Sequence, residues 1–280
     1  MQSSEPIKSR TNPLVQRLRR LKQRAEAGSE LILLEGPKLV LEALASGVSV
    51  LEAVASPRAQ ASAAGRAALL ALSAAGREPR ALDAGLFDSL SEVDTSQGLL
   101  ALARRPVFSL EAVFAPPPAL VLVAVEVQNP GNLGALLRTA EAAGASGALL
   151  TAGCADAFSW KALRGSMGSA LRLPHVRGLA LEAALALLRE RGLLAMAASA
   201  DAALRHDEAD LTGPCALLVG SEGAGLPEAA LAGADCRVRI PMAGRVESLN
   251  VGIAAGVLLF EAARQRRVAV RPRDPLVRQT

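Results

Sequence analysis

Aromatic residues are the scarcest feature of this sequence of 280 residues, which holds no tyrosine, one tryptophan and five phenylalanines, 2% in all. Hydrophobic residues nevertheless make up 51%, so we expect a sizeable core built from Leu, Val and Ala. The length fits one large or two ordinary domains, because about 150 residues per domain is usual. The lack of rings disfavours nucleic-acid binding that relies on stacking bases against aromatic side chains.

Cysteine is also scarce, and its spacing argues against two kinds of site. Cys154, Cys215 and Cys236 lie far apart without a C-x-x-C pair, so we expect reduced, partly buried thiols and neither a disulfide framework nor a zinc site. The isolated His175 and His206 are more typical of surface or hydrogen-bonded residues than of metal ligands or catalytic bases. We therefore expect no metal.

Long apolar runs are missing as well. No stretch approaches the roughly 18 residues that a membrane span requires, and the first residues, Met1–Glu5, form no apolar signal region. The sequence predicts a soluble, cytoplasmic protein that makes no contact with a membrane.

Positive charge gathers near the two ends of the chain, within a net charge of +4. Positions 1–25 are rich in Arg and Lys, with Glu5 as the one acidic residue, and positions 269–280 form a basic tail. Such ends suit the phosphate backbone of a nucleic acid, and the alternative is a solvated helix face and a loose tail. For the N-terminal segment we favour phosphate contact, with four candidate residues: Arg17, Arg19, Arg20 and Lys22.

The first hundred residues have the pattern of a compact α/β unit. Asn12 is a plausible cap for a basic helix from about Pro13 to Ala27, with proline at the first helical position. The apolar runs predict strands over 31–34, 48–54, 80–82 and 99–103, and helices over 36–44 and 61–75.

Prolines then mark a boundary. Pro106 and the run Pro116–Pro118 can continue neither a helix nor a central strand. We therefore divide the chain into a domain over 1–108, a linker over 109–118, a second domain over 119–268 and the tail over 269–280.

The second domain alternates strands with helices, which implies a parallel sheet covered on both faces. The predicted strands are 120–125, 148–150, 193–197, 216–219 and 237–240, and the predicted helices are 133–143, 160–171, 181–191 and 249–266.

Three polar clusters interrupt this apolar domain, each directly after a predicted strand. Since ligands of open α/β sheets bind beyond the carboxyl ends of the strands, the clusters predict one shared pocket. The first contains Asn132, Gly134 and Arg138. Its glycine spacing is not the G-x-G-x-x-G of a dinucleotide loop. Taken alone, Arg138 is typical of a helix surface.

The second cluster is Gly220–Gly225. A P-loop would continue with Lys and then Ser or Thr, and here Leu226 and Pro227 follow instead. A tight turn explains the glycines, whereas Glu222, a carboxylate at a strand end in an apolar domain, needs a partner. Arg138 is a reasonable candidate for that partner.

The third cluster runs from Ile240 to Asn250. Ser248 is a plausible cap for the last helix, while Asn250, in the first turn of an apolar helix, must find hydrogen bonds. Gly252 and Gly256 would let this helix approach another backbone closely, and a second subunit is one such neighbour.

Together the clusters resemble the three motifs of the SpoU (TrmH-like) family of RNA ribose 2′-O-methyltransferases, within the knotted SPOUT superfamily. The N-terminal stretches 12–15, 33–36 and 42–44 resemble that family's ribosomal-protein-like substrate-binding domain. The resemblance implies an α/β protein whose C-terminal parallel-sheet domain forms a deep trefoil knot. It also implies a homodimer with its active sites at the interface.

The same resemblance implies a function. The chain would be an S-adenosylmethionine-dependent enzyme that methylates a ribose 2′-hydroxyl in RNA, most simply ribosomal RNA. The cofactor would contact Gly220, Ile240, Met242 and Leu249. The reacting centre would be lined by Arg138, Glu222, Ser248 and Asn250, with Asn132 in support.

Two alternatives stay open. A transfer RNA methyltransferase would share every catalytic residue, and only the N-terminal resemblance favours ribosomal RNA. A non-catalytic RNA-binding assembly factor on the same fold is disfavoured because all the motif residues are present.

Overall fold

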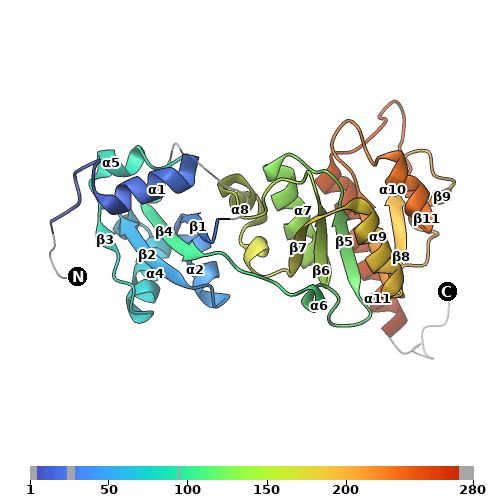
Figure 1. Cartoon of the computed structure of the whole chain (residues 1–280), viewed down its shortest axis with the longest axis horizontal. Helices are drawn as coiled ribbons and strands as arrows, with labels where there is room; N and C mark the ends of the chain where they lie inside the picture. Colours follow the sequence, from blue (N-terminus) through green and yellow to red (C-terminus); the bar gives the residue numbers. More distant parts are fainter. Residues whose placement is uncertain (1–4, 24–28, 94, 271–280) are drawn as a thin grey trace, which may run out of the picture. The chain divides into compact units, whose positions relative to one another are not determined.

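The structure is a computed structural model that describes residues 5–23, 29–93 and 95–270 (Figure 1). The chain forms two compact units. Unit 1 comprises Met1–Val107 and Asp156–Arg172, and unit 2 comprises Phe108–Ala155 and Leu173–Thr280. The second segment of unit 1 comes from within the range that the sequence assigned to the second domain.

Unit 1 has a four-stranded mixed sheet in the order β1-β4-β2-β3, in which β4 runs antiparallel to β1 and β2. The strands and helices expected for its N-terminal part are confirmed, and the short helices α3 and α5 were not expected. The elements are α1 (Pro13–Gln23), β1 (Leu31–Glu35), α2 (Pro37–Ala45), β2 (Val50–Ala55), α3 (Arg58–Ala61), α4 (Ala63–Ala74), β3 (Arg80–Ala81), α5 (Ala84–Asp88), β4 (Leu99–Arg104), α8 (Trp160–Ser166) and the 3₁₀ turn η1 (Ser169–Leu171).

Helix α1 is fixed to unit 1 by one apolar face. Asn12 caps it as expected, since its Oδ1 accepts a hydrogen bond from the Leu14 backbone N–H at 3.0 Å. Leu14, Val15 and Leu18 are buried in a cluster with residues of β1, β2, β4 and α5. Each fully buried aliphatic side chain contributes about 1.5–3 kcal/mol to folding, so these contacts hold the apolar face of α1 against the sheet. The opposite, basic face is left to solvent. Residues 24–27 of the expected helix lie outside the described residues.

Unit 2 has a seven-stranded sheet in the order β7-β6-β5-β10-β8-β11-β9, in which every pair is parallel, as expected. Its elements are α6 (Leu110–Val113), β5 (Leu120–Ala124), α7 (Pro130–Ala143), β6 (Gly147–Thr151), β7 (His175–Leu179), α9 (Leu181–Glu190), β8 (Leu194–Ala198), β9 (Leu204–Arg205), β10 (Cys215–Val219), α10 (Glu228–Gly233), β11 (Cys236–Arg239) and α11 (Val251–Val270).

Helices cover both faces of this sheet. Alternate residues of the central strands, such as Val121, Val123 and Leu218, are buried in one cluster with residues of α6, α9 and α10. Helices α7 and α11 pack against each other, α7 against β6 and α11 against β10. Because the central strands are buried on both faces, they are continuous apolar runs in the sequence.

The short elements α6, within the range predicted as a linker, and β9 were not expected, and the prediction was also wrong at two neighbouring places. The helix expected over 160–171 ends at Ser166, because Met167 and Gly168 have positive φ angles of 51° and 90°. The strand β7 was not expected, since its sequence, His-Val-Arg-Gly-Leu, lacks an apolar run and forms an edge of the sheet.

The last helix is fastened at its C-terminal end. Gln265 accepts a hydrogen bond from the Leu211 N–H and donates one to the Ala209 carbonyl. The guanidinium of Arg266 donates to the backbone carbonyls of four residues at 2.6–3.1 Å: Pro118, Ala119, Leu211 and Gly213. Arg266 thus has a structural role and is no part of a free basic end; positions 271–280 of the tail lie outside the described residues.

The expectations drawn from the scarcity of cysteine and of long apolar runs can be compared with the structure. The three cysteines are free, and burial raises the pKa of the Cys154, Cys215 and Cys236 thiols. Among the described residues, no helix is both long and apolar enough to span a membrane.

We predict that Arg266→Ala destabilises unit 2 by about 2–4 kcal/mol, because several carbonyls lose a charged donor at once. Denaturant unfolding of the full chain would measure this loss. Arg267→Ala is the matched control, since Arg267 is exposed on the same turn, and it should change the free energy of unfolding by about 0.5 kcal/mol or less. Equal stability of the two variants would contradict the fastening role.

Candidate functional site

A cleft of about 900 Å³ lies at the carboxyl ends of β8, β10 and β11 in unit 2. Parallel strands direct their following loops to one edge of the sheet, which brings segments distant in sequence together. Two of the three polar clusters line this cleft, and the loop after β8 joins them. The lining segments are 198–201, 219–226, 238–242 and 246–251, together with Leu231 and Ala254.

The loop after β10 is a tight backbone turn. Gly225 donates its N–H to the Ser221 carbonyl at 3.0 Å, and Gly223 and Gly225 have φ angles of 88° and 67°. A Cβ atom at Gly220 would overlap the carbonyl of Gly225, so only glycine fits there. The turn presents main-chain groups and the Glu222 carboxylate to the cleft.

Asn250 is the residue that begins α11. Its Oδ1 accepts hydrogen bonds from the Gly252 and Ile253 backbone N–H groups at 2.9 and 3.4 Å. This is an N-cap, so the expectation that Ser248 caps the helix was wrong. Ser248 is exposed two residues earlier and lines the cleft.

The amide of Asn250 also joins the three clusters. Its Nδ2 donates to Glu222 Oε1 and, over 3.5 Å, to Asn132 Oδ1. Asn132 is held in the first turn of α7, where Asn129 Oδ1 accepts from the Gly131 and Asn132 N–H groups. The structure thus brings Asn132, Glu222 and Asn250 together through hydrogen bonds.

Arg138 does not join them within one chain. It is exposed on α7, and the described residues offer it no hydrogen bond or ion pair. The expected pairing of Glu222 with Arg138 was therefore wrong, since Glu222 is bonded to Asn250. Six helical residues carry Arg138 about 9 Å along the axis from Asn132 and about 120° around it, so their side chains diverge.

The glycines of α11 face α7 of the same chain. A Cβ on Gly252 would stand 3.5 Å from Ala135 Cβ, and one on Gly256 would stand 3.4 Å from Thr139 Cγ2. The close approach predicted from these glycines thus exists, but its neighbour is α7 and no second subunit is needed for it.

All four residues expected to contact a cofactor line the cleft: Gly220, Ile240, Met242 and Leu249. Sequence reasoning missed the loop after β8, where Ser199 and Asp201 also line it. Only the parallel pairing of β8 between β10 and β11 reveals that loop, since it carries no motif.

The cleft presents the carboxylates of Asp201, Glu222 and Glu247 with the guanidinium of Arg239, so it favours a ligand with positive charge.

The expected RNA-binding residues of α1 differ in their surroundings. Arg17 pairs with Glu52 at 2.8 Å, and Lys22 donates to the Ser91 carbonyl at 2.9 Å. Arg19 and Arg20 have no partner among the described residues, and Arg20 is exposed.

The described part of the chain contains no group of His, Cys, Asp and Glu arranged to hold a metal ion.

Two family models match the chain. One, described as the SpoU rRNA Methylase family, matches residues 119–260. The other, described as an MRM3-like substrate binding domain, matches residues 12–101.

Individual proteins agree with these matches. The chain is 38% identical over 212 residues to the 23S rRNA (guanosine-2'-O-)-methyltransferase RlmB of Pseudomonas putida, covering 71% of this chain and 83% of the relative. It is 45% identical over 159 residues to an uncharacterized tRNA/rRNA methyltransferase of Synechocystis sp., covering 56% and 58%. The chain spans about half the length of several such curated relatives.

The fold has solved counterparts. The AdoMet-bound rRNA methyltransferase from Sinorhizobium meliloti is 30% identical, with a TM-score of 0.78 over 93% of this chain and 97% of that chain.

We predict that Asn250→Ala lowers the free energy of unfolding by about 1–2 kcal/mol, because α11 loses its cap. Asn250→Ser is the matched control: it keeps a capping oxygen but cannot reach Glu222, and should lose only a few tenths of a kcal/mol. Thermal or denaturant unfolding would compare the two. If both variants lost the same stability, the cap would not be what Asn250 contributes to folding.

Proposed function

The chain belongs to the SpoU rRNA methylase family, and from that membership we propose that it transfers a methyl group from S-adenosylmethionine to a ribose 2′-hydroxyl of RNA, with ribosomal RNA as the substrate. The observation that carries the proposal is the hydrogen-bonded junction of Asn132, Glu222 and Asn250 at the rim of a ligand-sized cleft. The MRM3-like match of unit 1 supports RNA as the partner.

The cleft fits S-adenosylmethionine by size and chemistry. Its volume of about 900 Å³ lies within the range of roughly 300–1,000 Å³ for pockets that hold small organic ligands. Ile240, Met242 and Leu249 offer apolar contact for an adenine ring, and the Gly220–Gly225 turn offers main-chain donors and acceptors. The neighbouring carboxylates suit a ligand that carries a sulfonium and an ammonium group.

When bound, S-adenosylmethionine supplies a methyl group already activated by the positive sulfur. Transfer would join the methyl carbon to the ribose 2′-oxygen, would leave the sulfur as a neutral thioether, and would pass the hydroxyl proton to an acceptor at the site. The residues of this chain have to align the hydroxyl and accept or relay that proton. Glu222, fixed by Asn250, is placed to hold a polar group at the cleft, and Ser248 lines the same cleft with an exposed side chain.

Arg138 acts, in this proposal, on the site of a second subunit. A guanidinium keeps its proton above pH ~12, so we assign Arg138 to the phosphate next to the reacting ribose instead of to proton removal. In its own chain it has no partner among the described residues. On α11, Ile253 and Phe260 are 58% and 46% exposed and seven residues apart, hence on one face. This apolar face supports a homodimer built on α7 and α11.

Three further expectations are part of the proposal. The C-terminal domain is knotted, as in the SPOUT superfamily that the sequence resembles. The location is cytoplasmic, where ribosomal RNA is available as substrate. Transfer RNA remains the alternative substrate, since relatives of this chain bear the name tRNA/rRNA methyltransferase.

We predict that the chain binds S-adenosylmethionine in calorimetry and methylates unmodified ribosomal RNA. Arg138→Ala should lower the methylation rate by about 100-fold or more while leaving the cofactor dissociation constant within about threefold, because Arg138 does not line the cleft. Absence of cofactor binding in the unaltered protein would refute the proposed activity.

The subunit origin of Arg138 can be tested with the same variant. Each variant alone should be inactive, and co-expression of Arg138→Ala and Asn250→Ser chains gives mixed dimers. If Arg138 crosses the interface, one site of a mixed dimer combines an unaltered Asn250 with the unaltered Arg138 of the other chain and is intact. Activity should then return to at most about a quarter of the normal value, because half of randomly paired dimers are mixed. If Arg138 serves its own chain, neither site is intact and no activity returns.

We also predict that Arg19→Gln with Arg20→Gln weakens RNA binding and flattens its salt dependence. The slope of log K against log salt should fall by about 0.7–0.9 for each phosphate that the protein no longer neutralises. Arg77→Gln with Arg80→Gln removes the same charge from two exposed residues of unit 1, one after α4 and one at the start of β3, and is the matched control. Equal slopes for the two double variants would assign Arg19 and Arg20 to an ordinary solvated helix face.

A further inference from the structure

The segment Asp156–Arg172 brings the one tryptophan of the sequence into unit 1. Asp156 and Arg105 anchor its start through a two-bond ion pair of 2.5 and 3.0 Å, with side chains only 10% and 12% exposed. Arg172 pairs with Glu42 at its end. Between these anchors α8 buries Ala162, Leu163 and Ser166, and it exposes Lys161 and Arg164 to solvent.

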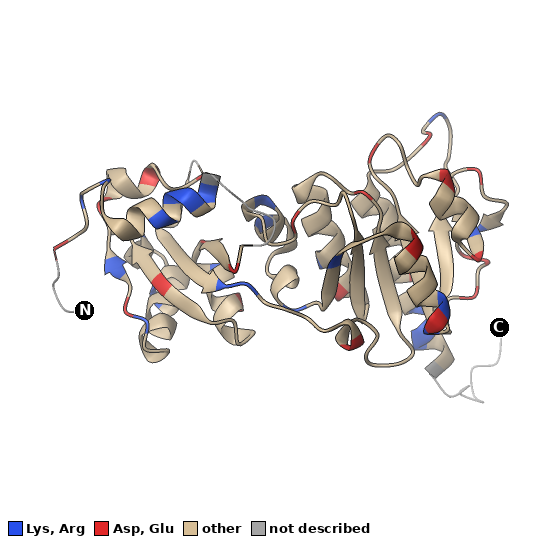
Figure 2. Cartoon of the chain, in the orientation of Figure 1, with Lys and Arg blue, Asp and Glu red and all other residues tan. Residues whose placement is uncertain are grey.

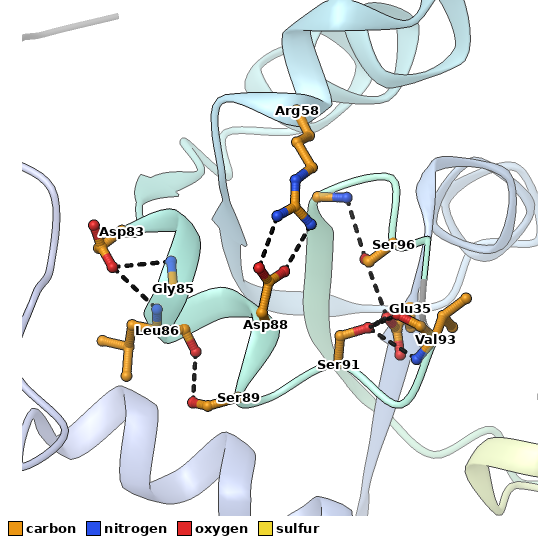
Figure 3. A network of polar contacts seen from close by, with 11 residues as sticks. Glu35, Arg58, Asp83, Gly85, Leu86, Asp88, Ser89, Ser91, Val93 and Ser96 are labelled. Atoms are coloured by element: carbon orange, nitrogen blue, oxygen red, sulfur yellow. Dashed lines mark hydrogen bonds and ion pairs between the residues drawn. The ribbon is translucent and has the colours of Figure 1, made fainter.

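The indole of Trp160 is held in a fixed position. Its Nε1–H donates to Glu35 Oε2 at 2.8 Å, while Ser91 and Ser96 donate to the other oxygen of the same carboxylate. Figure 3 shows Glu35 with these two serines at the end of β1. Because the edge of the indole is bonded, the plane of the ring cannot turn freely.

The outer face of α8 combines cations with apolar surface. Trp160 and Arg164 lie on one face of α8, four residues apart, and Met167 follows at the end of the helix. The guanidinium carbon of Arg164 lies 5.3 Å from the centre of the Trp160 ring, and Met167 is 48% exposed. Lys161 is exposed beside them and has no partner among the described residues.

The basic end of α1 meets this surface. Lys22 and Trp160 line the same small cleft of about 30 Å³, together with Phe158 and residues of β1. Arg19 lies one turn before Lys22 on α1, and therefore on the same side of that helix. Figure 2 shows basic residues both at this end of α1 and on α8. The cleft is too small for a nucleobase, so a ligand would lie across its rim.

We propose that Arg19, Lys22, Trp160, Lys161 and Arg164, here called the α1–α8 surface, bind a single-stranded segment of the RNA substrate. One unpaired base stacks on the Trp160–Arg164 pair, and the lysines and Arg19 hold the neighbouring phosphates. The inference rests on the proposed function and adds to it which part of unit 1 touches RNA and in what form.

Charge and geometry both favour this occupant. The surface presents four cations, and the carboxylate of Glu35 beside the ring already accepts three hydrogen bonds. Bases inside a duplex are stacked on each other, so a ring such as Trp160 can bind only bases that are free. A purely structural role for α8 accounts for its buried face and its bond to Glu35, but not for the cations around a partly exposed ring.

Because Trp160 is the one tryptophan, its fluorescence reports directly on this surface. The full chain would be titrated with an oligouridylate of about twelve nucleotides, a length typical of single-strand sites, while anisotropy of a labelled copy measures total binding. We expect the Trp160 emission to be quenched in step with binding, and a blunt RNA duplex of equal length to cause little quenching.

Variants separate stacking from folding. Trp160→Phe keeps a ring and should bind within about threefold of the unaltered chain, whereas Trp160→Ala should bind about 5- to 100-fold more weakly. Arg164→Gln should also weaken binding. Arg77→Gln, the same charge change at an exposed residue that is not part of the α1–α8 surface, should have no effect.

The outcomes distinguish this proposal from the one on which it rests. Binding without quenching, with Trp160→Ala and Arg164→Gln as tight as Arg77→Gln, would overturn the α1–α8 surface and leave the proposed methyltransferase intact. If no RNA bound to the unaltered chain, both proposals would fail.

Discussion

One side-chain amide, that of Asn250, holds the candidate site together. Its oxygen begins α11 by accepting two backbone N–H groups, and its nitrogen reaches Glu222 from the loop after β10 and Asn132 from the start of α7. Helix start and site geometry therefore depend on the same group. Because α11 also packs on α7 through Gly252 and Gly256, a shift of the helix would move every member of the junction.

Most of the fold could be predicted because the strands of unit 2 are buried on both faces and so leave apolar runs that the sequence displays. The site was predictable to the same extent: the motif residues follow these strands, and parallel pairing must bring their loops to one edge. The predictions that were wrong concerned hydrogen bonds that depend on tertiary contacts. No local signal reveals that Asn250 and not Ser248 caps α11, or that Glu222 bonds to that cap instead of to Arg138.

The division into two units carries a similar lesson. A domain boundary placed at prolines follows local chemistry, whereas the return of Asp156–Arg172 to unit 1 depends on contacts with Glu35, Glu42 and Arg105, which lie far away in the sequence. Composition alone argued against stacking on aromatic rings. A single tryptophan can still matter when the fold sets it among cations, since position and not abundance decides what one ring can bind.

The fastening of α11 by Arg266 has a consequence for how the protein comes to be made. The helix that bears Asn250 closes onto carbonyls of residues 118, 119, 211 and 213, all translated earlier. Asn250 and the helix that it caps are therefore held in place by contacts made sixteen residues further along the chain. The cleft can reach its final form only after Arg266 has been translated and has met those carbonyls.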